Sequence, residues 1–363
     1  MNKKMFVVSR DKKEALELSS QNKTVGYIKE NNITFYPDDI SIVMKESETL
    51  LNDLNSHDIV EICDNGKLYK WYSSKDGDAG IATTPKCNSN CIMCPAFDFE
   101  RQKNPEMDIN DMINFICLFP KSLYHFTITG GEPTLIGEEH FCKVLKTVSE
   151  TLPYTEVLLL TNGRSLAKEH FFKHIIKVLP NNFRIAIPIH GSNAQKHDYI
   201  VQSENAFDQT LKGIYNVLKA GIFLELRIVV SKLNKDDITN IAKLIIDKFP
   251  AVGIVHFIGL EMRGNCIIYK DDTIISYEEA FKSSAKAIDL LLNAGINVGL
   301  YNFPYCMIDR YYWPIAQKSI SAYKSKFYEE CNECIMKEQC CGLFTTSKAF
   351  LKPKVTPIGG KYD

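Results

Sequence analysis

The sequence predicts an α/β protein built around an open or partial (β/α)6 barrel, with a small mainly β module before it and a cysteine-rich extension after it. Two patterns support this prediction. Short apolar stretches alternate with amphipathic helical stretches, which favours parallel strands joined by right-handed crossovers. Before them, polar and apolar residues alternate in the manner of strands. The expected domains are residues 1–78, 79–302 and 303–363.

In the N-terminal module, short β-type stretches are separated by turn residues. The expected strands are 25–28, 33–36, 40–44, 59–63 and 67–72. The last two flank Asp64-Asn65-Gly66, which is a strong signal for a tight hairpin. A turn-rich segment at 73–80 would end the module.

The central part contains six apolar strand candidates, each followed by a longer stretch. The expected strands are 81–84, 126–129, 157–161, 183–189, 224–230 and 254–258. The expected helices are 139–151, 165–178, 206–220, 235–249 and 277–293. In a barrel of this kind, functional groups lie at the C-terminal ends of the strands and on the loops that follow.

Composition narrows the class of protein. The net charge of −1 disfavours a nucleic-acid partner, and no apolar run approaches the ~18 residues of a membrane span. The apolar residues 5–8 are too few for a signal peptide, so we expect a cytoplasmic protein. Cytosolic thiols stay reduced, and the twelve cysteines are therefore expected to bind metal or to pack, not to form disulfides.

The first cysteine cluster follows the first barrel strand. Cys87, Cys91 and Cys94 have the spacing C-x3-C-x2-C. Three thiolates can hold three irons of a 4Fe-4S cluster and leave the fourth iron open to another ligand. Zinc is the alternative, but it needs four ligands, and no fourth Cys or His lies nearby in the sequence.

The second barrel strand ends in Gly130-Gly131-Glu132-Pro133. Two glycines allow another molecule to approach the backbone, and the carboxylate can pair with an ammonium group; plain turn glycines are the alternative. The two motifs in this order resemble those of the radical S-adenosylmethionine (radical SAM) superfamily. The resemblance implies that the partial barrel is of the radical SAM type.

The same resemblance implies the roles of individual residues. Cys87, Cys91 and Cys94 would ligate the cluster, whose open iron is chelated by SAM. The implied SAM-binding residues are Met93, Gly130, Gly131, Glu132, Asn162, His190, Arg227 and Ile258. Met93 stands where the family usually has an aromatic residue. From the residues alone, Asn162 fits a turn and His190 a packed core histidine equally well.

The second cluster lies near the C-terminus. Cys331, Cys334 and Cys340, with Cys306 upstream, supply four thiolates, which fit tetrahedral zinc or a fully ligated cluster. The run C-x2-C-x5-C-x-G after such a barrel resembles the twitch or SPASM extension, which carries an auxiliary 4Fe-4S cluster. Cys341 could be a spare thiol, an alternative ligand or a hydrogen donor. The remaining cysteines are expected to be structural: Cys63, Cys117, Cys142 and Cys266.

Within the superfamily, the chain resembles the His-Xaa-Ser system maturase in residues 87–94, 197–202, 207–208, 258–261 and 318–323. This resemblance implies a radical SAM enzyme that abstracts hydrogen from a ribosomally made precursor peptide. Ferredoxin or flavodoxin would donate the electron, and a second maturation protein would be a further partner. The alternatives are a radical SAM enzyme for a small metabolite and a noncatalytic zinc-binding adaptor.

Overall fold

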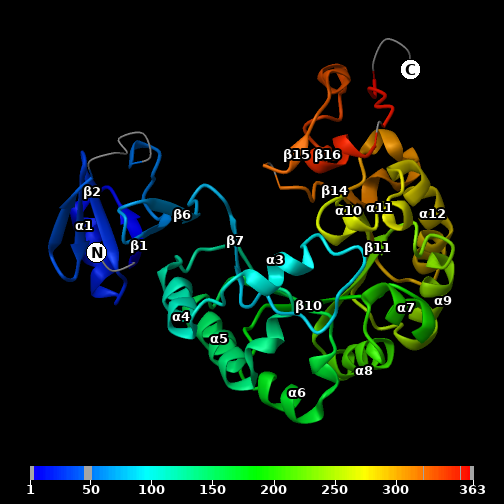
Figure 1. Ribbon diagram of the computed structural model, residues 1–363, viewed down its shortest axis with the longest axis horizontal. Coiled ribbons are helices and arrows are strands. Elements are labelled where there is room, and N and C mark those ends of the chain that lie inside the picture. Colours follow the sequence, from blue (N-terminus) through cyan, green and yellow to red (C-terminus); the bar gives the residue numbers. More distant parts are fainter. Residues whose placement is uncertain (1–3, 45–50, 322, 352, 360–363) are drawn as a thin grey trace.

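The computed structural model describes residues 4–44, 51–321, 323–351 and 353–359. It has the predicted α/β fold, with an N-terminal β-sheet, a parallel partial barrel and a C-terminal extension (Figure 1). Residues 1–3 and 360–363 of the outer predicted modules, and Ala322 of the 318–323 motif, lie outside the described residues.

The N-terminal sheet has the strand order β4-β3-β2-β1-β5-β6. Its elements are β1 Lys4–Ser9, α1 Lys12–Ser20, β2 Val25–Lys29, β3 Asn32–Tyr36, β4 Ile40–Val43, β5 Ile59–Ile62 and β6 Leu68–Tyr72. The predicted β5–β6 hairpin is present, with Gly66 at φ 78° in its turn. The sequence prediction missed β1 and α1. Because β1 is central and buried on both faces, it lacks the alternating pattern of a half-exposed strand.

The barrel is one parallel sheet in the order β14-β13-β12-β11-β10-β9-β8-β7. Its two end strands, β7 and β14, do not pair with each other, so the barrel is open. The strands are β7 Asp78–Ala82, β8 His125–Thr129, β9 Glu156–Leu160, β10 Phe183–Pro188, β11 Phe223–Val230, β12 Ile254–Gly259, β13 Val298–Tyr301 and β14 Ala316–Gln317. The first six correspond to the predicted strands, and the short β13 and β14 extend the sheet.

Helices cover the outer face of this sheet. They are α4 Ile109–Leu118, α5 Glu138–Thr151, α6 Glu169–Ile175, α7 Ala194–Val201, α8 Ala206–Lys219, α9 Ile238–Lys248 and α12 Tyr277–Asn293. The short helices are α3 Asp98–Lys103, α10 Asn265–Ile268 and α11 Lys270–Thr273. Figure 1 shows the longer helices in an arc around the sheet, with α3 on its inner side. No helix among the described residues has the length and apolarity to cross a bilayer.

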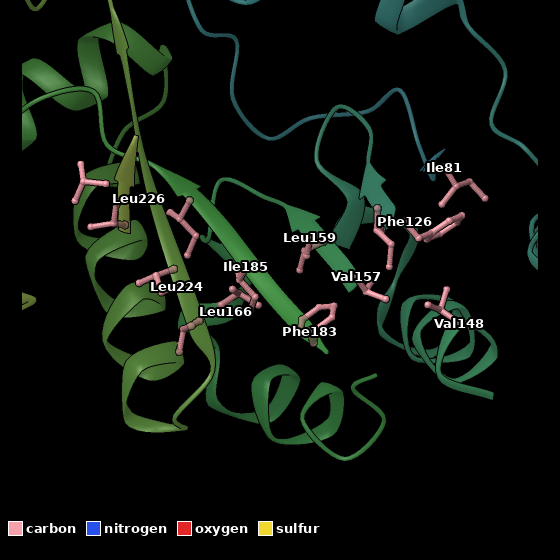
Figure 2. Close-up of a cluster of buried hydrophobic side chains, with 14 of the residues drawn as sticks. Ile81, Phe126, Val148, Val157, Leu159, Leu166, Phe183, Ile185, Leu224 and Leu226 are labelled. Carbon is pink, nitrogen blue, oxygen red and sulfur yellow. The ribbon is translucent and has the colours of Figure 1, made fainter. Parts of the chain in front are cut away.

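The main core lies between the sheet and these helices. Alternate residues of β11 point to opposite faces, so that Leu224, Leu226 and Ile228 join the core while Arg227 lines a cavity inside the barrel. Figure 2 shows Leu224 and Leu226 beside the buried side chains of β9 and β10. The same alternation leaves the inner face of the sheet free to carry polar groups.

The C-terminal extension contains little regular structure. It comprises the two-stranded sheet β15 Ser325–Lys326 and β16 Leu343–Phe344, with single 3-10 turns at Tyr305–Met307, Arg310–Ile315, Glu329–Glu333 and Thr345–Ala349. Leu343 and Met307 pack with Tyr277 of α12, which attaches the extension to the barrel.

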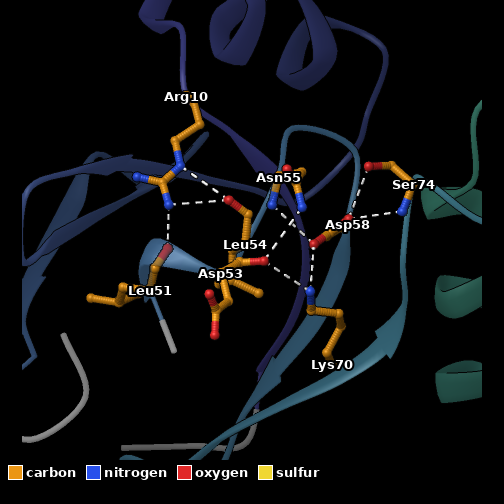
Figure 3. A network of polar contacts seen from close by, with 8 residues as sticks. All are labelled: Arg10, Leu51, Asp53, Leu54, Asn55, Asp58, Lys70 and Ser74. Carbon is orange, nitrogen blue, oxygen red and sulfur yellow. Dashed lines mark hydrogen bonds and ion pairs between the residues drawn. The ribbon is translucent and has the colours of Figure 1, made fainter. Parts of the chain in front are cut away.

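A buried carboxylate closes the open end of the β5–β6 hairpin (Figure 3). Asp58 accepts hydrogen bonds from the backbone N–H of Asn55 at 2.9 Å and of Ser74 at 2.8 Å, and Lys70 lies 3.0 Å away. Although burial opposes it, these hydrogen bonds hold the pKa of Asp58 below its ordinary value. The charged form therefore stabilises the folded module.

Replacing Asp58 with Asn should lower the free energy of unfolding by about 1.5 to 3 kcal/mol at neutral pH, because charge-assisted hydrogen bonds are lost. Since the folded-state pKa is depressed, the difference from wild type should persist down to about pH 4 and shrink as Asp58 becomes protonated. Urea unfolding across this pH range measures it. The exposed Asp53→Asn is the control, and equal stability of the two variants would contradict the assignment.

Candidate functional site

A cavity of about 780 Å³ lies inside the barrel toward the C-terminal ends of its strands. Residues from β7 to β12 and from the loops after them line it, together with Trp71 of β6 and Phe115 of α4. The volume falls in the ~300–1,000 Å³ range of small-molecule sites. The position agrees with the rule that parallel barrels carry their functional groups at this end.

Three cysteines of the loop between β7 and α3 line this cavity: Cys87, Cys91 and Cys94. Burial, together with the neighbouring thiols of Cys94 and Cys87, raises the pKa of Cys91 to about 12. A thiol held protonated in this way is a poor nucleophile. A cationic metal centre would deprotonate all three, and the donor set therefore fits a metal cluster. Among the described residues lining the cavity there is no other cysteine and no histidine.

Two arginines hold this cysteine loop, which has no helix or strand of its own. Nη1 of Arg164 donates to the carbonyl of Asn88 at 2.5 Å and to Oγ of Ser89 at 3.1 Å. From the other side, Arg101 donates to the carbonyl of Ser89 at 3.2 Å and to Oδ1 of Asn90 at 2.7 Å. The sequence prediction did not include either arginine. The only signal was the position of Arg164 directly after an Asn-Gly turn at the end of a strand.

The end of α7 also supports the cysteine loop. The backbone N–H groups of Asn90 and Ile92 donate to the carbonyls of Val201 and Ile200, each at 3.0 Å. These two acceptors belong to the 197–202 motif that resembles the peptide maturase. Two other residues of the motif join α7 to α8, because His197 contacts the ring of Phe207 and Asp198 accepts from the Phe207 N–H. In this structure the motif has contacts that support the loop.

The two glycines after β8 are required by close packing against the start of the cysteine loop. A Cβ on Gly130 would lie 2.5 Å from the carbonyl oxygen of Thr84, and one on Gly131 would overlap the carbonyls of Pro85 and Lys86. The N–H of Gly131 donates to the Thr84 carbonyl at 2.7 Å. The close approach is therefore made by the chain itself, and both glycines also line the cavity.

Glu132 is fully buried and joins the loops after β8 and β9. Its Oε1 accepts from the hydroxyls of Thr134 and Thr161, each at 2.7 Å, and its Oε2 accepts from the N–H of Asn162 at 2.7 Å. Burial raises its pKa, although these hydrogen bonds oppose the rise. The carboxylate lies behind the cavity wall, and Glu132 is not among the lining residues.

The remaining predicted cofactor residues divide into two groups. Asn162, Arg227 and Ile258 line the cavity. The side chain of Asn162 also accepts from the Arg164 N–H, which is a turn contact, and donates to Asn88 of the cysteine loop. Met93 does not line the cavity and packs with Ile200, Leu260 and Cys266.

His190 is also buried and absent from the lining. Burial, with the nearby His197, lowers its pKa to about 3, so that the ring is neutral at physiological pH. Its Nδ1 is buried and has no hydrogen-bond partner among the described residues. An unpaired buried nitrogen of this kind is uncommon in folded proteins.

Contacts with Glu225 and Tyr301 hold the guanidinium of Arg227, which faces the cavity. Nε of Arg227 donates to Oε1 of Glu225 at 2.6 Å, and Nδ1 of His256 lies 3.0 Å from the same oxygen. The ring of Tyr301 stacks on His256 and lies beneath the Arg227 guanidinium. Although burial opposes it, the His256 contact and the charge of Arg227 lower the pKa of Glu225 to about 2. The guanidinium is thereby held in one orientation.

A second cavity lies in the C-terminal extension, and Cys306, Cys331, Cys334 and Cys340 all line it. Burial raises the pKa of Cys306 to about 11, with further contributions from the Cys340 and Cys331 thiols. The structure therefore brings together the four cysteines predicted to form this set. Backbone N–H groups also point at the sulfurs, with Ile358 donating to Cys334 and Gly342 to Cys340.

Cys341 lies outside this lining and is buried with Ile320 and Phe344. Its hydrogen bond with Cys340, together with the Gly342 N–H, lowers the pKa of Cys340 to about 6 against the effect of burial. Of the four single cysteines, Cys266 is buried, while Cys63, Cys117 and Cys142 are half-buried.

The region that carries the first cysteine site is similar to a known protein family. Residues 81–245 match the Radical SAM superfamily. The chain is 26% identical over 231 residues to the Fe-coproporphyrin III synthase of Methanosarcina barkeri (61% of this chain, 52% of that protein). It is 29% identical over 163 residues to a GTP 3',8-cyclase of Helicobacter pylori (43% and 48%). The chain thus spans about half the length of these curated relatives.

Among solved structures, the chain is similar to native anSMEcpe with bound AdoMet and Kp18Cys peptide. The TM-score is 0.48 with 18% sequence identity, and the match covers 61% of this chain and 63% of that one.

The contacts of Arg164 lead to a test of loop anchoring. Arg164→Ala should accelerate amide hydrogen exchange in peptides covering 87–94 by about tenfold or more, because the Asn88 and Ser89 acceptors lose their donor. Peptides of β9 serve as the internal control and should be unchanged. Arg164→Lys keeps the charge without the fork and should give an intermediate rate. Unaltered exchange in the alanine variant would exclude the anchoring role.

Proposed function

We propose that residues 81–245, which match the Radical SAM superfamily, form the catalytic part of an enzyme that cleaves SAM reductively and abstracts hydrogen from a substrate. The observation that carries this proposal is the set of three thiols lining one cavity without a fourth protein ligand among its described lining residues. Three thiolates leave one iron of a 4Fe-4S cluster open to SAM.

When bound, the reduced cluster and SAM supply a 5'-deoxyadenosyl radical that can remove hydrogen from an unactivated carbon. The chain would position these groups. Arg227, fixed by Glu225, presents a cation suited to the SAM carboxylate. Ile258 offers an apolar surface for adenine, whereas His190 lies behind the residues that line the cavity.

The role proposed for the glycine motif is more indirect. Gly130 and Gly131 line the cavity, where the SAM ammonium could contact the backbone. Glu132 lies behind them and would add negative charge near that ammonium while holding the loops after β8 and β9. Glu132 is therefore proposed as a positioning residue, which affects SAM binding through the loops that it holds in place.

For the C-terminal cavity, we propose an auxiliary 4Fe-4S cluster held by Cys306, Cys331, Cys334 and Cys340. Four converging thiols would complete the coordination of such a cluster and leave no position for SAM. Tetrahedral zinc is the alternative for the same four ligands. Among the residues that the structure describes, the two sites share none of their lining.

The proposed substrate is a ribosomally made peptide, on the resemblance of the sequence to a peptide maturase. The second candidate is a small metabolite, which the names of the curated relatives, a Fe-coproporphyrin III synthase and a GTP 3',8-cyclase, favour. Copurification of the tagged enzyme with a short ribosomal peptide from its own host would support the first. A modified small molecule in cell extracts, with no peptide modified, would support the second.

Metal content tests the proposed pair of clusters. Anaerobically reconstituted protein should bind about eight iron ions per chain, and changing Cys87, Cys91 and Cys94 together to Ala should leave about half, as two four-iron clusters require. Iron analysis and visible absorption provide the measurement. The half-buried Cys117→Ala is the control and should keep the full iron content. Zinc without iron at both sites would instead support the adaptor alternative.

The different roles proposed for the two clusters give a second test. Cys331→Ala with Cys334→Ala should spare part of the reductive SAM cleavage, measured as 5'-deoxyadenosine without substrate, while Cys91→Ala should abolish it. The reason is that only the three-cysteine site leaves an open iron. Circular dichroism must first show that each variant is folded, because losing a cluster can destabilise a protein. Undiminished 5'-deoxyadenosine from the Cys91 variant would contradict the assignment.

A further inference from the structure

Two histidines and one carboxylate converge on the outer side of the barrel, away from both cysteine sites. Glu138 begins α5, while His170 and His174 lie one turn apart on α6. Nδ1 of His170 is 3.2 Å from Oε2 of Glu138, and Nδ1 of His174 contacts Oε1 of the same carboxylate. One ligand atom from each of the three residues lies within 4.8 Å of the other two.

Apolar packing beneath the surface sets this convergence. The rings of Phe141 on α5 and Phe171 on α6 stack at 6.1 Å and hold the two helices together. Figure 1 shows α5 and α6 as neighbours on the outer arc. Glu138 precedes Phe141 by one turn, and His170 and His174 share one face of α6. The three polar groups therefore meet above a rigid apolar contact.

The donor set is typical of a transition-metal site. Two imidazoles spaced by four residues on a helix, with a carboxylate from a second element, match the ligands and the spacing that bind zinc. Each histidine places its Nδ1 against a different oxygen of one carboxylate. A divalent cation could replace the two protons that these contacts otherwise require. The partial exposure of His174 and Glu138 leaves room for water to complete the coordination.

We propose that Glu138, His170 and His174 bind a divalent transition-metal ion of the zinc type, separate from the clusters held by the cysteines. Imidazole nitrogen and carboxylate oxygen favour Zn²⁺ over the hard cations Mg²⁺ and Ca²⁺. Iron-sulfur clusters require thiolates, and the Sγ of Cys142, one turn further along α5, is not part of the converging group.

An ion at this position would link helices α5 and α6. α5 and α6 follow the loops after β8 and β9, which carry Glu132 and Asn162. Those loops are already joined by Glu132 and by the hydrogen bond between the hydroxyls of Thr134 and Ser165, whose oxygens lie 2.8 Å apart. An ion held between Glu138 and the two histidines would link the two helices that follow these loops, from the outer side of the barrel.

The test adds one equivalent of Zn²⁺ to the anaerobically reconstituted, tag-free holoprotein, whose cysteines are occupied by iron. Isothermal titration should give one zinc per chain, with affinity weakened at least about tenfold by His174→Ala or Glu138→Gln, because a ligand is lost. His140→Ala is the matched control: His140 is an exposed histidine on α5 outside the cluster, and its loss should change the affinity by less than about twofold.

X-ray absorption at the zinc edge identifies the ligands without interference from iron. The expected spectrum has only nitrogen and oxygen scatterers near 2.0–2.2 Å. Sulfur scattering near 2.3 Å would place the zinc at cysteines and overturn the proposal. Equal zinc affinity in wild type and His174→Ala would do the same. Iron analysis after the titration must show that zinc has displaced no iron.

Discussion

The first cysteine site depends on the hydrogen bonds that order the loop between β7 and α3. This loop forms no helix or strand of its own. A loop without regular structure pairs few of its own N–H and C=O groups, and a buried unpaired group is costly. Here distant segments supply the partners. Arg164 follows β9, Arg101 lies on α3, and the carbonyls of Ile200 and Val201 end α7. The positions of the three thiols thus depend on contacts between residues far apart in sequence.

The same dependence extends through the glycine motif. Gly130 and Gly131 lie against Thr84 to Lys86, so that the end of β8 is in contact with the start of the cysteine loop. Glu132 then connects this unit to the loop after β9 through Thr161 and Asn162. A side chain larger than hydrogen at either glycine would separate β8 from the cysteine loop. Three consecutive strand ends therefore form one hydrogen-bonded unit, and a ligand bound there would meet a preorganised surface.

The sequence predicted features that depend on local pattern. The six main barrel strands and the grouping of Cys306 with the three later cysteines follow from periodicity and spacing. β13 was missed because Val298–Tyr301 is short and contains Gly299, and β14 has only two residues. Arg101 and Arg164 were missed because nothing near them in sequence indicates a loop 11 to 76 residues away as their partner. The burial of Met93 and Glu132 likewise depends on tertiary packing that a motif does not encode.

The open topology of the barrel leaves two sheet edges, β7 and β14, and a flanking module lies next to each in the chain. β7 and β14 do not pair with each other, so each would leave an unpaired edge, which proteins generally shorten or cover. β14 is very short, and the extension after it is tied back to the barrel where Lys324 meets Glu261, 3.1 Å apart, beyond β12. At the β7 edge, Trp71 of the N-terminal sheet borders the cavity and is held by a 2.7 Å hydrogen bond to Glu61. The N-terminal sheet thus contributes directly to the cavity wall, and a substrate entering beside β7 would meet its indole ring.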